Sequence, residues 1–184
     1  MTTFYILIAV AACYFFIVFV VLRLIAPFMG FKQYEPPTDL PPEIRQDIIE
    51  LENKSHDQMS YLQSVYNSVL GRWQHSRFKA AVLLPKLFKS DLNKIWHTKG
   101  FVYCTTINFV VYVLLANSKY FSAGGGSASG GKETDEFVKV KHVFLNFVPH
   151  QYLQVRVDGK WVDVDPAGAG IRGFGLGHHA SWFG

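Results

Sequence analysis

Cysteine is scarce in this sequence, because its 184 residues include only Cys13 and Cys104. Cys13 lies inside a long apolar run, so we expect no disulfide between the two and no disulfide framework. Lysine and arginine are scattered among acidic and aromatic residues rather than gathered in a block, and the net charge is only +4. Without a basic stripe on the chain, we predict that nucleic acid is not a partner.

A recognisable metal or cofactor pattern is also missing. His178 and His179 follow Gly177 near the C-terminus, but no further cysteines or carboxylates stand at the spacing of a metal-ligand set. The glycine-rich run Ala123–Gly131 lacks the Lys-Ser/Thr ending and the preceding strand of a phosphate-binding loop. We therefore predict no metal and no cofactor, and we expect both segments to be loops.

The N-terminal run has no charged side chain between Thr2 and Leu22, and a helix of this length can cross a hydrocarbon core of about 30 Å. No basic residue precedes it and no small-residue cleavage site follows it, which argues against a signal peptide. We predict a single transmembrane helix over residues 1–26, with a lipid bilayer as partner; a buried core helix is the alternative. Arg23 and Lys32 then place the remainder in the cytoplasm, although a signal-anchor could hold it outside.

The rest of the chain changes from helical to strand patterns. Four prolines in GFKQYEPPTDLPP predict a stiff juxtamembrane spacer over residues 27–42. Apolar residues then recur at three- and four-residue steps from Ile44 to Val69, which predicts one long amphipathic helix or two helices broken near Ser55. Cys104 to Ser118 is predicted as a buried central helix. Strand patterns follow, so residues 43–184 are predicted as an α+β domain with helices packed on an antiparallel sheet.

A hairpin is predicted around Asp158-Gly159, because this dipeptide stands between two alternating apolar runs. Pairing outward from a two-residue turn puts one apolar face toward the core, made of Leu153, Val155, Val162 and Val164. His150 and Asp165 share the opposite face as diagonal neighbours, with backbones about 7–8 Å apart. Asp163 is on that face too but lies a further rung away. The register therefore favours Asp165 as the carboxylate partner of the His150 imidazole.

The predicted histidine–carboxylate pair lacks a nucleophile, and Cys104 is the only thiol outside the apolar run. It opens the predicted central helix, where the helix dipole favours a thiolate and backbone N–H groups can bind an oxyanion. Trp73 or Trp96 could donate an indole N–H to the same oxyanion. A cysteine in an apolar context is more often an ordinary core residue, and His142 is an alternative base.

The motifs around these residues resemble those of the transglutaminase-like superfamily, the papain-related group of thiol enzymes. GFVYC precedes an apolar helix, and HQYLQVRVDGKWVDVDP then supplies a histidine, a strand, a turn, Gly-x-Trp-Val and Asp-Pro. The resemblance covers roughly residues 96–166. It implies a transglutaminase-like (papain-like) fold behind the membrane helix, with Cys104 as nucleophile, His150 as base and Asp165 as the residue that orients the base.

The function implied by the resemblance is thiol acyl chemistry. The chain would be a membrane-anchored hydrolase or acyltransferase, acting on a peptide or carboxamide bond of a protein or peptide substrate through a thioester. The alternative is a catalytically inactive fold that serves as a membrane-tethered interaction module, since Gln151-Tyr152 stands where the family often has Ala-Trp after its histidine. A small membrane-assembly component is a third possibility.

Overall fold

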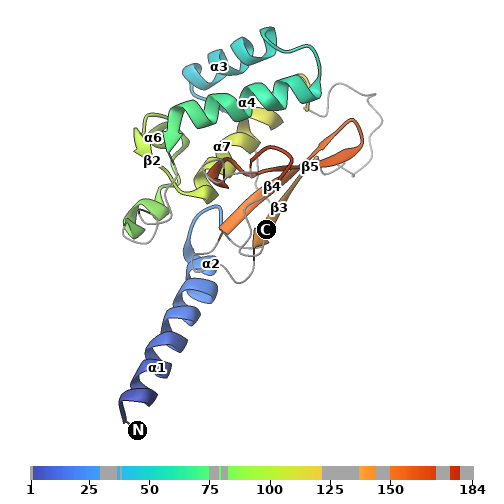
Figure 1. Cartoon of the computed structure of the whole chain (residues 1–184). Coiled ribbons are helices and arrows are strands. Elements are labelled where there is room, and N and C mark those ends of the chain that lie inside the picture. The colour runs from blue at the N-terminus through green and yellow to red at the C-terminus, as the bar shows by residue number, and fades with distance from the viewer. Residues whose placement is uncertain are drawn as a thin grey trace, which may run out of the picture.

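The computed structural model of the protein describes residues 2–29, 37, 39–74, 79, 83–121, 137–143, 150–168 and 175–178. Within these ranges a group of helices precedes a small antiparallel sheet, as Figure 1 shows. The predicted α+β class is therefore confirmed. The glycine-rich run Ala123–Gly131, residues 30–36 and 38 of the proline-rich spacer, and His179 lie outside the described residues.

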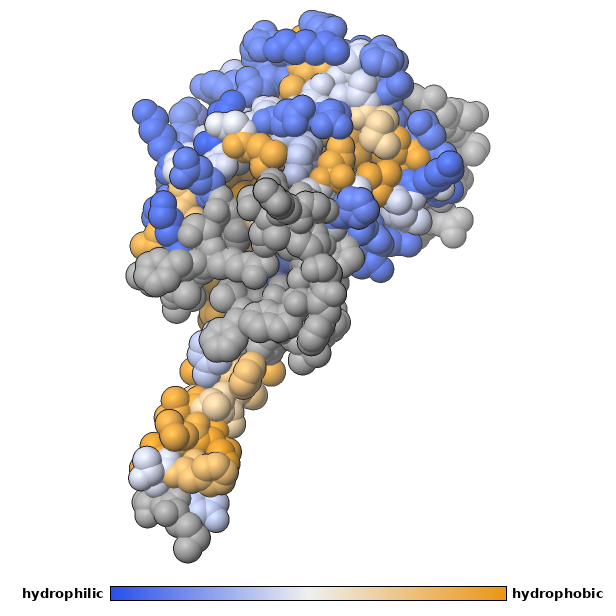
Figure 2. Space-filling view, viewed as in Figure 1, coloured by the Kyte–Doolittle hydropathy of each residue, from blue (hydrophilic) through white to orange (hydrophobic). Residues whose placement is uncertain are grey.

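The apolar N-terminal run forms three consecutive helical elements, namely α1 (Thr2–Phe16), a π-helical turn η1 (Ile17–Val21) and α2 (Leu22–Ile25). They project away from the rest of the protein, and their surface is mostly hydrophobic (Figures 1 and 2). Among the described residues, no helix is long and apolar enough to cross a membrane, so the prediction of a transmembrane helix over residues 1–26 is wrong. The π-helical turn divides the run, and α1 has only 15 residues where about 20 are needed.

The amphipathic segment that follows forms two helices, α3 (Pro42–Asn53) and α4 (Gln58–Arg72). Pro42 occupies the first turn of α3, where its missing N–H is not needed. A capping box begins α4, in which the Asp57 carboxylate accepts a hydrogen bond from the backbone N–H of Ser60 at 2.6 Å. This cap explains the break, and of the two predicted alternatives the structure shows two helices broken near Ser55.

Short elements lead from α4 to the central helix. The two-residue strands β1 (Trp73–Gln74) and β2 (Gly100–Phe101) pair in parallel, with η2 (Leu84–Phe88) and α6 (Leu92–Trp96) between them. The central helix α7 (Cys104–Ala116) is buried on nearly every side and lies between the α3–α4 pair and the strands (Figure 1). The predicted buried helix beginning at Cys104 is thus confirmed.

The sheet consists of β3 (Val138–Val143), β4 (His150–Val157) and β5 (Lys160–Val164), with β4 in the middle. The β4–β5 turn is the predicted Asp158-Gly159 dipeptide, with φ of 47° and 80°. Both residues lie in the left-handed region that such a turn requires. Leu153 pairs with Val164 and Val155 with Val162, as predicted, and this apolar face belongs to the main core. The last helical turn, η3 (Pro166–Gly168), follows β5 directly.

Candidate active site

The central contact of the site joins the start of β4 to the end of β5. The imidazole Nε2 of His150 lies 2.7 Å from Oδ2 of Asp165. The His150 side chain is 11% exposed and the Asp165 side chain is fully buried. The predicted diagonal placement of these two residues is therefore the observed one. An imidazole held this way has its ring orientation fixed by the carboxylate.

Cys104 is the first residue of α7 and is 4% exposed. Cys104 is among the groups that raise the pKa of His150, so its thiol lies beside the imidazole. Because Nε2 contacts Asp165, Nδ1 is the ring nitrogen left for the thiol. The three residues predicted from the sequence thus lie in one chain of contacts, from thiol to imidazole to carboxylate.

The protonation of His150 follows from these neighbours. Burial is the strongest single effect and opposes the charged imidazolium. Hydrogen bonds with Asp165 and with Cys104, together with their negative charges, outweigh it and raise the pKa of His150 from 6.5 to about 10. An imidazolium next to a sulfur atom stabilises a thiolate, which is the reactive form of cysteine.

The Asp165 carboxylate is held on both oxygens. While Oδ2 contacts the imidazole, Oδ1 accepts a hydrogen bond from the backbone N–H of Gly168 at 2.9 Å. The Asp165 backbone N–H in turn donates to the carbonyl of Gly175 at 3.1 Å. Burial and, secondly, the Asp165 charge raise the pKa of Tyr66, a buried side chain of α4. These contacts fix the carboxylate in one orientation.

Space behind the carboxylate is also tight at Gly175. A Cβ placed there would collide with the hydroxyl of Tyr66, and the φ of Gly175 is 142°. Glycine is the residue that meets both conditions without strain.

The other sequence candidates lie elsewhere. Asp163 accepts a hydrogen bond from Gln154 at 2.8 Å, so its carboxylate is engaged one rung away. Val143 pairs with His150 and His142 with Gln151, so His142 points to the opposite face of the sheet from His150. The Trp73 indole N–H donates to the Thr98 carbonyl at 2.8 Å, which removes it as an oxyanion donor.

Two side chains near the site were not singled out from the sequence. Asn108 lies one turn after Cys104 on α7, and its Nδ2 donates to the backbone carbonyl of Gln151 at 2.8 Å. Gln151 is the neighbour of His150 on β4 and is itself 1% exposed. The signal in the sequence was the amide at position 108 within a mostly apolar helix, four residues after the candidate nucleophile.

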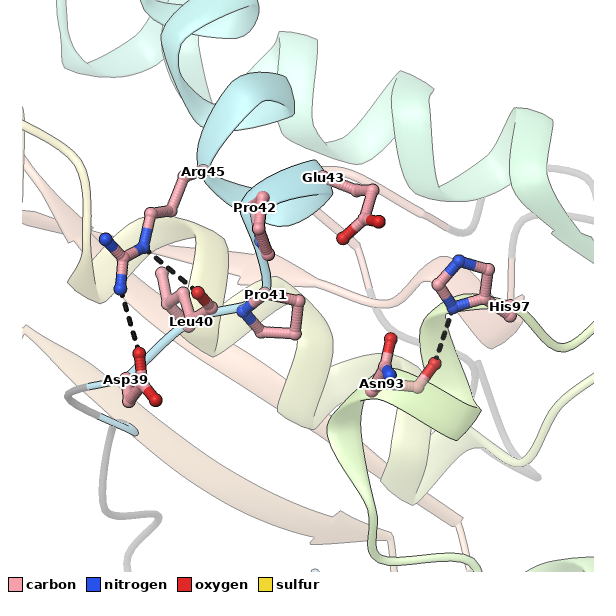
Figure 3. Close-up of a pocket in the computed structure, with 8 residues that line it drawn as sticks. All are labelled: Asp39, Leu40, Pro41, Pro42, Glu43, Arg45, Asn93 and His97. Carbon is pink, nitrogen blue, oxygen red and sulfur yellow. Dashed lines mark hydrogen bonds and ion pairs between the residues drawn. The ribbon is translucent and has the colours of Figure 1, made fainter.

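Within the described residues, no group of three or more His, Cys, Asp or Glu side chains is arranged to hold a metal ion. A surface pocket lies where α3 begins, facing α6 (Figure 3). Three of its polar side chains have partners within the lining, because Arg45 contacts Asp39 at 2.9 Å and His97 contacts the Asn93 carbonyl at 2.9 Å. None of the three candidate catalytic residues lines it.

Comparisons with protein-family models, with curated proteins and with solved structures find no match for this chain. The predicted transglutaminase-like fold is therefore corrected to an α+β fold that these comparisons assign to no family. The resemblance rested on a hairpin and on the start of one helix, and such local motifs do not determine how the remaining elements are connected.

Proposed function

We propose that the protein is a cysteine-nucleophile hydrolase or acyltransferase that acts on a peptide or carboxamide bond. The observation that supports this most is the 2.7 Å contact between His150 and Asp165, on an imidazole whose pKa is also raised by Cys104. Nucleophile, base and orienting carboxylate stand in the order that covalent thiol catalysis uses. Cys104 is accordingly the nucleophile, His150 the base and Asp165 the residue that orients the base.

The reaction would proceed in two steps. The Cys104 thiolate attacks the carbonyl carbon, and the resulting oxyanion collapses to a thioester as the C–N bond breaks. The His150 imidazolium gives its proton to the departing amine. Water or a second amine then attacks the thioester while His150 takes up a proton, and the Cys104 sulfur leaves. The products are a carboxylic acid or a new amide, and the starting enzyme is restored.

The backbone at the start of α7 suits the oxyanion. The first N–H groups of an α-helix have no carbonyl partner within the helix, and the Tyr103 side chain forms no capping hydrogen bond there. Such donors can stabilise negative charge that develops beside Cys104. No metal or cofactor enters either step.

The test compares the reactivities of the two cysteines of the chain. Cys13 is exposed on α1, whereas Cys104 is buried, so accessibility alone would make Cys13 the faster thiol to react with iodoacetamide. We expect Cys104 to be labelled faster at neutral pH, as measured for each cysteine-containing peptide by mass spectrometry. An activity-based probe for thiol acyl enzymes should label the wild type and not Cys104→Ala. A Cys104 that reacts no faster than free cysteine contradicts the proposal.

The 4% exposure of Cys104 favours a second candidate, an inactive fold that serves as an interaction module. A nucleophile needs an open path to its substrate, while a module that only binds partners does not. Absence of probe labelling in a folded wild-type protein, together with retained binding of a partner, would select this candidate.

We further propose that a lipid bilayer is a partner of α1. Large apolar side chains are exposed around this helix, with Phe4, Leu7 and Val10 each more than 60% exposed. Exposed apolar surface of this extent marks an interaction site. The full chain should float with phospholipid vesicles, and Leu7→Asp should weaken flotation. Equal flotation of both would count against it. That the domain faces the cytoplasm stays a prediction.

A further inference from the structure

Three segments distant in sequence meet beside the candidate active site. The Asn108 amide donates to the Gln151 carbonyl at 2.8 Å, and the Gln151 amide donates to the Phe28 carbonyl at 3.0 Å. The Phe28 ring stacks on Phe109, with ring centroids 3.9 Å apart and planes inclined by 10°. We refer to Phe28, Asn108 and Gln151 as the amide cluster. It ties the N-terminal segment to both α7 and β4.

The amide cluster lies next to two of the three candidate catalytic residues in the chain. Asn108 is four residues after Cys104, so both side chains lie on one face of α7. Gln151 directly follows His150 on β4. The hydrogen bond between Asn108 and Gln151 therefore holds the strand that carries the imidazole against the helix that carries the thiol.

The amide cluster contains buried polar groups and a strained backbone conformation, both of which are unfavourable for stability. Asn108 and Gln151 are each 1% exposed, although burying an amide is unfavourable unless every polar atom finds a partner. Oδ1 of Asn108 has no hydrogen-bond partner among the described residues. Phe28 has a φ of 59°, in the left-handed region that large side chains avoid. Strain and buried polar groups of this kind persist where the surrounding structure holds them in place, and they gather at functional sites.

The N-terminal segment also contacts the residues that lead into Cys104. Ala26 packs in one buried cluster with Phe101 and Tyr103, the residues that lead into Cys104. Burial and then the charge of Cys104 raise the pKa of Tyr103 to about 12. Residues 26–28 therefore contact the chain before Cys104, the helix after it and the strand beside His150.

We propose that Asn108 and Gln151 are positioning residues that set the distance between Cys104 and His150, and that Phe28 makes this distance depend on the docking of the N-terminal helix. The proposal rests on the proposed function, since it assigns these residues to the same thiol–imidazole pair. A change at α1, such as binding to a bilayer, would reach the thiol through Phe28.

The experiment measures the alkylation rate of Cys104 by iodoacetamide as a function of pH, in full-length protein carrying Cys13→Ser. Three variants each remove one contact of the amide cluster: Asn108→Leu, Gln151→Met and Phe28→Leu. The matched control is Asn117→Leu, because Asn117 belongs to the last turn region of the same helix and donates to the Val113 carbonyl at 2.9 Å. Thermal unfolding of every variant is recorded in parallel.

In the amide-cluster variants we expect iodoacetamide to alkylate Cys104 at least about tenfold more slowly near neutral pH. A misplacement of reacting groups by about 1 Å can lower a rate by on the order of a hundredfold. Their pH–rate profiles should also be displaced, a change that loss of stability alone does not cause. The control should keep the wild-type rate and profile. Folded variants that label like the wild type would overturn the proposal.

The outcomes separate the two claims. A wild-type Cys104 that reacts no faster than free cysteine removes the proposed function, and the positioning role with it. If Cys104 is alkylated rapidly in the wild type and equally rapidly in the variants, only the positioning role is refuted. If Asn108→Leu does not fold, Phe28→Leu decides the matter, because Phe28 is only partly buried and lies outside α7.

Discussion

Replacement of Asp165 by asparagine tests the proposed site most directly. Asp165→Asn keeps the shape of the side chain, and its remaining oxygen can still accept from the Gly168 N–H. The amide nitrogen then faces Nε2 of His150 where a carboxylate oxygen stood at 2.7 Å. Two donors would oppose each other, so the imidazole must turn, lose its proton on Nε2 or give up the contact.

The size of the effect follows from the lost contact. A hydrogen bond to a charged group contributes about 1.5–3 kcal/mol, and each 1.4 kcal/mol is a factor of about ten. The balance between imidazolium and neutral imidazole should therefore move by roughly ten- to a hundredfold, lowering the pKa of His150. Because the pKa of His150 starts at about 10, His150 stays largely protonated at neutral pH, and we expect the loss of Cys104 reactivity between about pH 8 and about pH 10.

The assay is the pH dependence of Cys104 labelling between about pH 5 and about pH 10. This range includes both the ordinary pKa of histidine, 6.5, and the raised pKa of His150, about 10. Asp163→Asn is the control, since Asp163 lies two residues earlier and contacts Gln154 instead of His150. The reasoning is refuted if Asp165→Asn labels at the wild-type rate, or if both variants lose reactivity equally while remaining folded.

Three further predictions concern stability. The raised pKa of His150 contributes stability that is fully present below about pH 6.5 and is lost as the pH rises toward about 10, so urea titrations should show a falling free energy of unfolding in that window. His150→Gln should flatten this dependence. Gly175→Ala brings a Cβ against the Tyr66 hydroxyl and should lower the free energy of unfolding, measured by thermal denaturation, by about 1–3 kcal/mol more than Gly177→Ala does. Gly177 is the control because its φ of 88° is also positive, while a Cβ there meets open space. Asp57→Ala removes the α4 cap and should lower the temperature of unfolding without changing Cys104 labelling, and a changed labelling rate would point to long-range coupling.

The hairpin was predictable because its register is a local property. A two-residue turn at Asp158-Gly159 pairs Val157 with Lys160, and every later pair follows by counting. The same counting placed Asp165 near His150 and left Asp163 opposite Gln154. The two helices on either side of Ser55 were likewise encoded locally, by apolar spacing and the Asp57 cap.

The wider arrangement was not predictable in the same way. The approach of Cys104 to His150 depends on how α7 packs on β4. The sequence suggested it only by elimination, since Cys104 is the one thiol outside the apolar run, and by a resemblance that no comparison supports. The membrane-spanning helix was inferred from hydropathy, which does not reveal the π-helical turn Ile17–Val21. The amide cluster was missed because Phe28, Asn108 and Gln151 meet only after folding, and nothing local links them.

The division of the site between a hairpin and a helix has a consequence for the order in which the chain folds. His150 and Asp165 are only 15 residues apart and belong to one β-hairpin, so their contact closes a short loop at small entropic cost. The contact of Cys104 with His150 closes a much longer loop and needs α7 in place, and such non-local contacts form slowly. During refolding, the histidine should therefore acquire its carboxylate before it meets the thiol, and reactivity of Cys104 should be among the last properties to return.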